Sequence, residues 1–182
     1  MADCNNDHIQ IFNSQGQFAR TFGSEGAGNG QMKNPVGVGL LSNGNIVVAE
    51  SDGNRLQIFD SQGNFVRIVG AGQLKNPWHL FVDSDDNILV ADYMNSRIQV
   101  FHQNGNHVKT IGTGQISNPY GVCMDREGRI IVSEGGQRIS IFLGSLTHQI
   151  IIQIMVISPF SSFLWLLLFH VPERKKKKEK RL

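Results

Sequence analysis

The sequence predicts an all-β protein, because a block of about 42 residues recurs along it and each block consists of short strand-like runs. Pro35, Pro77 and Pro119 follow one another at intervals of 42 residues. Short apolar runs alternate with turn sequences such as Ser-Asn-Gly-Asn at 42–45, which is typical of antiparallel strands and not of helices. Four strands in about 42 residues match one blade of a β-propeller. The predicted fold is therefore a partial β-propeller of four-stranded antiparallel blades.

The repeat divides the chain into about three blades followed by a segment outside the repeat. We expect a propeller fragment over residues 1–142, made of a partial blade at 2–34, whole blades at 35–76 and 77–118, and a partial blade at 119–142. In the second whole blade the strands are expected at 78–83, 87–92, 97–101 and 106–111. Asn-Gly and similar pairs between them supply the positive φ angles that tight hairpins need.

Charge is distributed unevenly along the chain. Seven of the seventeen Lys and Arg residues lie between Arg174 and Arg181, whereas residues 1–171 carry ten basic and thirteen acidic side chains. The repeat region is therefore mildly acidic, although the formal net charge of the whole chain is +2. Cys4 and Cys123 are too few for a disulfide framework or for a zinc module with four close ligands. We therefore expect a reduced, cytoplasmic protein.

The repeated unit resembles the NHL repeat. In this chain the unit at 34–70 has the sequence NPVGVGLLSNGNIVVAESDGNRLQIFDSQGNFVRIVG. It contains Pro-x-Gly-Val, then a strand-like run that ends in an acid, and then Arg-Leu-Gln-Ile-Phe. The stretch GSEGAGNGQMKNP at 23–35 resembles the loop that joins successive NHL blades. The matches cover residues 2–142. The recurring Gly-His and Trp-Asp pairs of WD-type repeats are absent from the sequence.

The resemblance is closest to the NHL domains at the C-terminus of tripartite-motif (RING/B-box) ubiquitin ligases. In that family the propeller recognises protein or RNA, and a separate zinc-binding RING domain carries the ligase activity. NHL propellers usually close with about six blades, so the resemblance implies that the remaining blades are missing from this chain. We therefore predict a non-catalytic binding module that is not an enzyme and holds no cofactor. A metal-dependent lyase of the kind some NHL-like propellers form is a further alternative.

Charged residues recur once per blade, and we interpret them as structural. An acid ends each second strand and a basic residue opens each third strand, where the two are expected to pair and to hold the intervening turn. An active site needs different residues at one place, whereas these repeat with the fold. The structural positions are Glu50, Asp92 and Glu134 with Arg55, Arg97 and Arg138, preceded by Asp3 and His8.

Other residues with reactive side chains are also expected to have structural roles. Asp83, Asp85 and Asp86 form the densest acidic cluster and suggest calcium, but they occupy a hairpin position, so we expect turn residues. The six histidines lack the paired spacing of zinc ligands. Cys123 lies in an apolar first strand and is expected to be a small core residue. We predict no catalytic and no metal site.

The predicted binding surface consists of loops on one face of the propeller. Function in propellers usually resides on such loops, and these combine basic, amide and aromatic side chains. A protein partner is the first prediction. Single-stranded or hairpin RNA is the alternative, because aromatic and basic groups stack on bases and contact phosphates, although the acidic repeat region disfavours phosphate binding. The candidate residues are Lys33, Asn34, Lys75, Asn76, Trp78, Tyr93, Asn118 and Tyr120.

Residues 143–182 lie outside the repeat and form a hydrophobic segment with a basic tail. The 22 residues from Ile150 to Val171 carry no Asp, Glu, Lys or Arg, and as a helix they would be long enough to cross a membrane. A single-pass anchor is therefore an alternative localisation, although Pro159 weakens the helix. The other interpretation is that this segment is read-through sequence from a retained intron or a shifted reading frame. Residues 147–152 fall where a fourth strand would complete the last blade.

Overall fold

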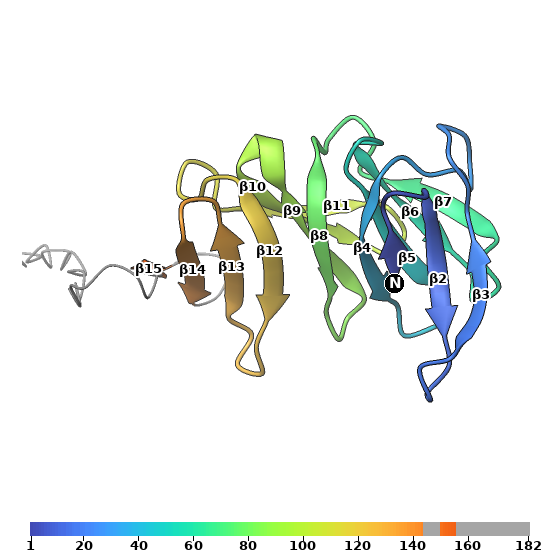
Figure 1. The fold of residues 1–182 in the computed structure, drawn as a ribbon. Helices are drawn as coiled ribbons and strands as arrows, with labels where there is room; N and C mark the ends of the chain where they lie inside the picture. The colour runs from blue at the N-terminus through green and yellow to red at the C-terminus, as the bar shows by residue number, and fades with distance from the viewer. Residues whose placement is uncertain (144–149, 156–182) are drawn as a thin grey trace, which may run out of the picture.

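Four antiparallel sheets stand side by side in the computed structural model, which describes residues 1–143 and 150–155 (Figure 1). We number the sheets as blades 1 to 4 in chain order. Blade 1 contains β1 (Ala2–Asp3), β2 (His8–Phe12) and β3 (Phe18–Phe22); blade 2 contains β4 (Pro35–Leu40), β5 (Ile46–Glu50), β6 (Arg55–Phe59) and β7 (Phe65–Val69). Blade 3 contains β8 (Pro77–Val82), β9 (Asn87–Asp92), the short 3-10 helix η1 (Tyr93–Asn95), β10 (Arg97–His102) and β11 (His107–Ile111). Blade 4 contains β12 (Pro119–Met124), β13 (Ile130–Glu134), β14 (Arg138–Leu143) and β15 (Ile150–Met155).

The predicted fold class is confirmed. Within each blade every strand pairs antiparallel with the next strand along the chain. Blade 1 holds three strands among the described residues, and these occupy the positions of the second, third and fourth strands of the repeat. The strand bounds of blade 3 agree with the predicted ones to within one residue at each end. Local alternation and turn residues therefore carry most of the information that specifies a blade.

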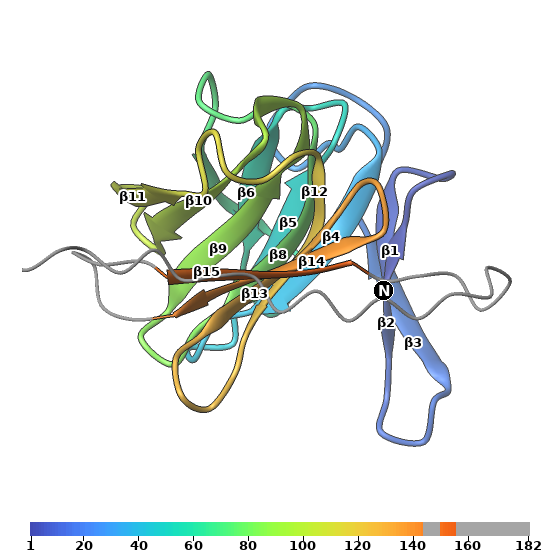
Figure 2. The same cartoon turned by 90° about the vertical axis from the view of Figure 1, so that its left-hand side faces the viewer.

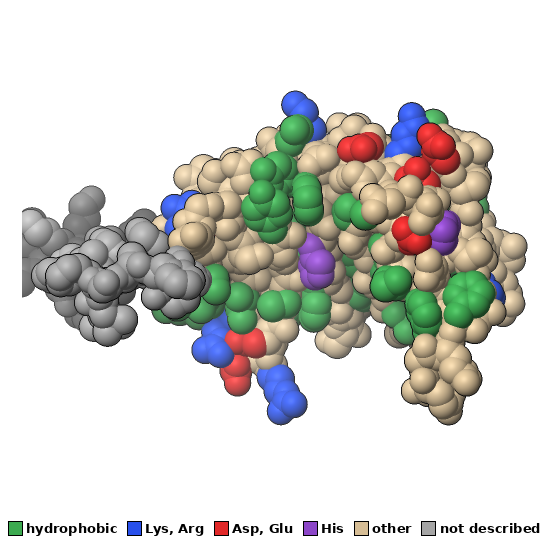
Figure 3. All heavy atoms as spheres, viewed as in Figure 1, with side chains coloured by type: hydrophobic (Ala, Val, Ile, Leu, Met, Phe, Trp, Pro, Cys, Tyr) green, Lys and Arg blue, Asp and Glu red, His purple; other side chains and the backbone are tan. Residues whose placement is uncertain are grey.

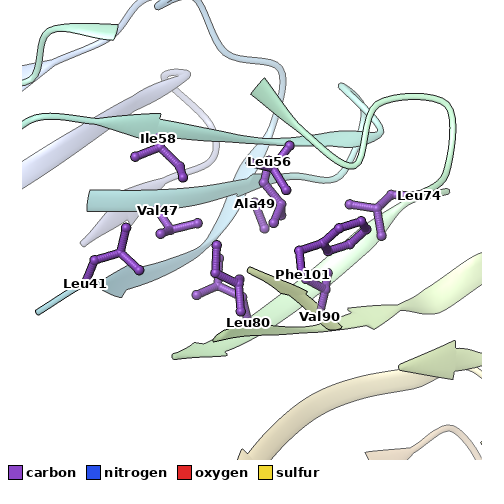
Figure 4. Close-up of a cluster of buried hydrophobic side chains, with 11 residues drawn as sticks. Leu41, Val47, Ala49, Leu56, Ile58, Leu74, Leu80, Val90 and Phe101 are labelled. Carbon is purple, nitrogen blue, oxygen red and sulfur yellow. The ribbon is translucent and has the colours of Figure 1, made fainter. Parts of the chain in front are cut away.

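Neighbouring blades are held together by apolar side chains from the facing sides of two sheets. Between blades 2 and 3, Ala49 and Leu56 point from one sheet toward Leu80 and Phe101 on the other, and all four side chains are buried (Figure 4). Equivalent clusters fill the space between blades 1 and 2 and between blades 3 and 4. Burial of such side chains is the main favourable term in folding, so a blade depends on its neighbours for stability.

Packing between the first strands of blades 2 and 3 is tight at Gly39. A Cβ atom added at Gly39 in β4 would lie 2.4 Å from Leu80 Cδ1 and 2.8 Å from Val82 Cγ2 in β8. The glycine therefore leaves room for the Leu80 and Val82 side chains, and a side chain added at this position would have to displace their methyl groups.

A recurring backbone hydrogen bond also joins each blade to the next. The residue that precedes the third strand has a left-handed conformation, and its side chain accepts a hydrogen bond from the backbone N–H of the Asn directly before the first strand of the following blade. Asn54 Oδ1 accepts from Asn76 N at 2.7 Å, and Ser96 Oγ accepts from Asn118 N at 3.2 Å. Asp7 Oδ1 accepts from Asn34 N in the same way at 2.6 Å. The loop asparagines thus contribute to blade packing.

The Asp83 to Asp86 cluster forms a turn and a link to the neighbouring blade. Asp83 Oδ1 accepts hydrogen bonds from the backbone N–H groups of Asp85 (2.9 Å) and Asn87 (2.8 Å). Asp86 is 7% exposed and has φ of 59°, a position that glycine holds in blades 2 and 4. Its carboxylate accepts from the backbone N–H (2.8 Å) and the hydroxyl of Ser42 in blade 2. The hydrogen bond from the Ser42 hydroxyl is the largest cause that holds the pKa of Asp86 below its ordinary value.

Replacing Asp86 by Asn is expected to reduce stability at neutral pH and to have little effect in acid. Asn also adopts the left-handed conformation, so the substitution tests the charge of the carboxylate rather than the backbone. The folded-state pKa of Asp86 lies below the unfolded value, so its stabilising contribution is present above about pH 4 and is lost as pH falls through the folded-state pKa. Thermal unfolding of both proteins between about pH 7 and pH 2 would measure this, with the exposed Asp85→Asn variant as control. A Tm difference that stays constant down to the lowest pH would contradict the assignment.

Part of the hydrophobic C-terminal segment belongs to the sheet. Residues 150–155 form β15, which pairs with β14 and completes blade 4. A helix from Ile150 to Val171 is therefore ruled out for its first six residues, while residues 156–171 lie outside the described residues. Among the residues that the structure describes, no helix has the length and hydropathy to cross a membrane.

Candidate functional site

The recurring acid and arginine organise the loops on one face of the blades, which we call the upper face. It carries the loops between blades and the connections between second and third strands. Glu50 is fully buried, and its Oε1 accepts hydrogen bonds from Arg55 Nε at 2.9 Å and Gln57 Nε2 at 2.7 Å. Its Oε2 accepts from the backbone N–H of Lys33 at 3.0 Å, and Arg55 donates to three carbonyl oxygens of the loop between blades 1 and 2.

The same arrangement recurs in the other blades. Asp92 accepts from Arg97 Nε at 2.8 Å and from the backbone N–H of Lys75 at 2.7 Å. Glu134 accepts from Arg138 Nη2 and from the backbone N–H of Ser117, each at 2.7 Å. In blade 1, Asp3 lies 3.4 Å from His8. Each carboxylate in blades 2 to 4 is thus engaged by the protein itself and anchors an upper-face loop.

Three aromatic residues from different strands and loops meet on the upper face. Trp78 is the second residue of β8, Tyr120 is the second residue of β12, and Tyr93 lies in η1 between β9 and β10. The ring centroids are 5.3 Å apart for Trp78 and Tyr120, 5.8 Å for Trp78 and Tyr93, and 5.0 Å for the two tyrosines. These edge-on and tilted contacts hold the rings in one rigid group, which we call the aromatic cluster.

The aromatic cluster is exposed to solvent. Trp78 is 41% and Tyr120 42% exposed. Figure 3 shows a hydrophobic patch on the upper half of the molecule, over the starts of β8 and β12. Trp78 Nε1 donates to Asn76 Oδ1 at 2.7 Å, which fixes the indole ring. The hydroxyl contact with Tyr120, at 3.4 Å, raises the pKa of Tyr93, so the Tyr93 phenol stays neutral at physiological pH. The cluster therefore presents rigid, uncharged, amphipathic side chains.

The structure brings some of the predicted surface residues together and separates others. Lys75 is exposed in the loop that leads to Trp78, and Asn118 packs beside Tyr120 near Gly135. Lys33 and Asn34 lie in the loop between blades 1 and 2, directly before β4. The hydrogen bonds of these two residues join them to Asp7, Glu50, Ser51 and Asp52 and not to the cluster. The predicted set thus divides into a compact part around the aromatic cluster and a separate part in the loop between blades 1 and 2.

Sequence reasoning missed Met94. This side chain follows Tyr93 in η1 and is 56% exposed, and its backbone N–H donates to the carbonyl oxygen of Lys75 at 3.1 Å. A signal for it existed, because the repeat places Tyr93 and Met94 where blade 2 has Ser51 and Asp52. Bulky side chains in one blade at a position that holds small or polar residues in another are candidates for function rather than for packing.

In the part of the chain that the structure describes, residues that could bind a metal ion form no group comparable with the aromatic cluster. Within residues 1–143 and 150–155, no three His, Cys, Asp or Glu side chains are grouped to hold a metal ion. Cys123 is exposed, so its expected place in the core is wrong. Its strand, β12, is innermost in blade 4, and the described structure places no further sheet on that side.

A family model supports the repeat assignment. Residues 32–59 and 74–101 match the NHL repeat. These segments run from the end of an inter-blade loop to the end of the third strand in blades 2 and 3. The chain therefore contains NHL repeats, which supports an NHL-type β-propeller. No curated protein matches the sequence.

Solved structures show the same fold. The chain is similar to a streptogramin B lyase (TM-score 0.65, 18% identity) and to virginiamycin B lyase from Staphylococcus aureus (TM-score 0.65, 20% identity). Each match covers 86% of this chain and 50% or 51% of the lyase. Hydrazine synthase from Kuenenia stuttgartiensis also matches, with TM-score 0.62, 12% identity and coverage of 80% and 43%. The chain thus spans about half the length of the solved structures it matches, and identities this low show the fold alone.

The prediction that the chain is not an enzyme is wrong, because this architecture does not exclude catalysis. It rested on the structural role of the recurring charged residues and on the separate RING domain of tripartite-motif ligases. Two of the solved structures with this fold are lyases, so a propeller of this kind also supports catalysis. The fold therefore does not separate binding modules from enzymes.

Proposed function

We propose that this chain is a protein-recognition module and that the aromatic cluster is the centre of its contact surface. The observation that carries the proposal is the exposure of Trp78 and Tyr120, held rigidly against Tyr93 by ring contacts. Trp and Tyr are enriched at the energetic centres of protein interfaces, because they bury a large area and lose little conformational entropy. The exposed thioether of Met94 extends the same surface, and Met is also enriched at interfaces.

The charge around the cluster favours a protein over RNA as partner. Residues 1–171 carry more acidic than basic side chains, whereas phosphate binding requires a local excess of positive charge. Lys75 is the basic side chain in the loop that leads to the cluster. RNA is therefore the alternative outcome of the test. The finer proposal is a recognition role of the kind that NHL propellers of tripartite-motif ubiquitin ligases perform, and upstream codons for a RING and a B-box would support it.

Trp78→Ala is expected to weaken specific partner binding strongly while the chain stays folded. Proteins captured from lysate by the wild-type chain would be compared with those captured by Trp78→Ala and by the control Val108→Ala. Val108 is 51% exposed on β11, away from the cluster. A partner lost with Trp78→Ala and retained by the control is then titrated, and a loss of affinity of about 30-fold is expected for a residue at the interface centre.

A salt titration separates protein from RNA recognition. Filter binding of single-stranded poly-uridine RNA would be measured from low to high salt with the same three proteins. Phosphate contacts give affinity that falls steeply with salt concentration. Tight, salt-dependent binding that Trp78→Ala weakens would replace the protein-recognition proposal with RNA recognition. Equal capture of every protein by wild type and Trp78→Ala would remove the aromatic cluster from the function.

A further inference from the structure

The blades pack through one interface that the chain repeats three times. Its first half is the side of a blade that faces the next blade, and in blade 2 this side carries Val47, Ala49, Leu56 and Ile58, all at most 1% exposed. We call this the forward side. The second half is the side that faces the preceding blade, which we call the backward side. Phe59, Phe101 and Phe142, at equivalent positions in blades 2 to 4, lie on it and are at most 3% exposed.

Blade 4 presents a forward side that the described structure leaves uncovered. Strand register places Cys123, Ile131, Ile141 and Ile152 in one row across the sheet, and Ser133, Ile139 and Ile154 in the next. Ile152 is 45% and Ile154 49% exposed. Figure 2 looks onto this end of the molecule, with β12 to β15 toward the viewer. A hollow of ≈ 230 Å³ opens at its inner part, lined by Cys123, Ile131 and Ile139 among others.

Blade 1 presents the complementary backward side. Phe12 holds the position of Phe59 and Phe101 but is 42% exposed, and its edge-on neighbour Phe18 is 60% exposed. Near the axis, Leu40 of β4 is 65% exposed, whereas its equivalent in blade 3, Val82, packs against the core between blades 2 and 3. The exposed apolar residues at this end are therefore those that internal blades insert into a preceding blade.

The two uncovered sides are the two halves of the same interface. They lie at opposite ends of the row of blades (Figure 1). Blade 4 also has the backbone conformation for the polar link between blades. Gln137 is left-handed, with φ of 61°, like Asn54 and Ser96, whose side chains accept a backbone hydrogen bond from the Asn before the next blade. Two copies of the four sheets would give eight, which falls within the four to eight blades of known propellers.

We propose that copies of this chain associate head to tail, with the forward side of blade 4 packed against the backward side of blade 1 of a second copy. The contact is heterologous, because each copy contributes a different surface to it. It continues the interface already formed three times within one chain, and it buries the apolar rows that the described residues leave exposed. The proposal does not depend on the function of the aromatic cluster.

Charged substitutions on either side are expected to abolish the association. The molar mass of the full chain would be measured by sedimentation over about a hundredfold range of concentration. Variants would carry Ile152→Lys with Ile154→Lys on the forward side, or Phe12→Lys with Phe18→Lys on the backward side. Val108→Lys, on a half-exposed residue of internal blade 3, is the matched control and should associate like wild type. Far-ultraviolet circular dichroism confirms that each variant keeps its strands.

Mixing the two variants tests the head-to-tail geometry. Each variant alone should be monomeric, whereas an equimolar mixture should recover one contact, because each retains the half that the other has lost. A wild-type chain that stays monomeric at every concentration would overturn the proposal. So would a Phe12→Lys and Phe18→Lys variant that still dimerises alone, because that result requires a contact between two identical sides.

Discussion

Replacing Glu50 by Ala is expected to destabilise the protein by about 3–5 kcal/mol, the range for breaking a buried ion pair by removal of one partner. The Glu50 carboxylate is fully buried, and Arg55, Gln57 and the backbone N–H of Lys33 all donate to it. Alanine would leave the Arg55 guanidinium, whose side chain is 12% exposed, without its carboxylate partner. Urea denaturation followed by circular dichroism measures the change in the free energy of unfolding.

Glu127→Ala is the control for this prediction. Glu127 pairs with Arg129 at 2.9 Å, but its side chain is 68% exposed, so the ion pair is solvated. Exposed pairs contribute at most about 1 kcal/mol, and the substitution should leave stability almost unchanged. Equal destabilisation by Glu50→Ala and Glu127→Ala would show that the buried carboxylate does not organise the upper-face loop.

Phe101→Ala is expected to cost about 3–5 kcal/mol of stability, because it opens a cavity between blades 2 and 3. The ring is fully buried and packs within the cluster that contains Leu74 and Leu80 (Figure 4). The same urea titration measures this loss. Because blades depend on one another, the unfolding transition should shift as a whole, without a separate early phase.

The repeat itself supplies a matched control for Phe101. Phe12 occupies the equivalent position in blade 1, yet it is 42% exposed and contacts chiefly Phe18 at its edge. Phe12→Ala should therefore cost about 1 kcal/mol, measured where the chain is monomeric. A loss as large as that of Phe101→Ala would mean that the first blade packs against something beyond the described sheets.

Much of the fold was predictable because its signals are local. Apolar alternation and turn residues lie within a few residues of one another, so the strands of blade 3 could be placed to within one residue. The pairing of Glu50 with Arg55 was also predictable, since the two residues lie five positions apart across one turn. The identity of Asp86 as a link to Ser42 was not, because the two residues lie 44 positions apart and meet across two blades.

The candidate site was predictable in its residues but not in its geometry. Trp78, Tyr93 and Tyr120 were each expected on a loop face, but their sequence separations do not show that the rings lie within 6 Å of one another. Lys33 and Asn34 carried the same sequence signal but lie in another loop, between blades 1 and 2. Contacts of this kind depend on how far adjacent sheets rotate and approach, which a repeat period does not specify.

By itself, the sequence determined the repeating unit, its four strands and the charged pair that recurs at each turn, because these follow from side-chain alternation and turn chemistry over short distances. The tertiary structure alone decided which copies of a repeated residue are buried. Phe101 and Phe12 occupy the same position of the unit, and one is enclosed while the other meets solvent. The physical reason is that burial is a property of the neighbouring sheet, and the same residue gains stability from it only where that sheet is in place.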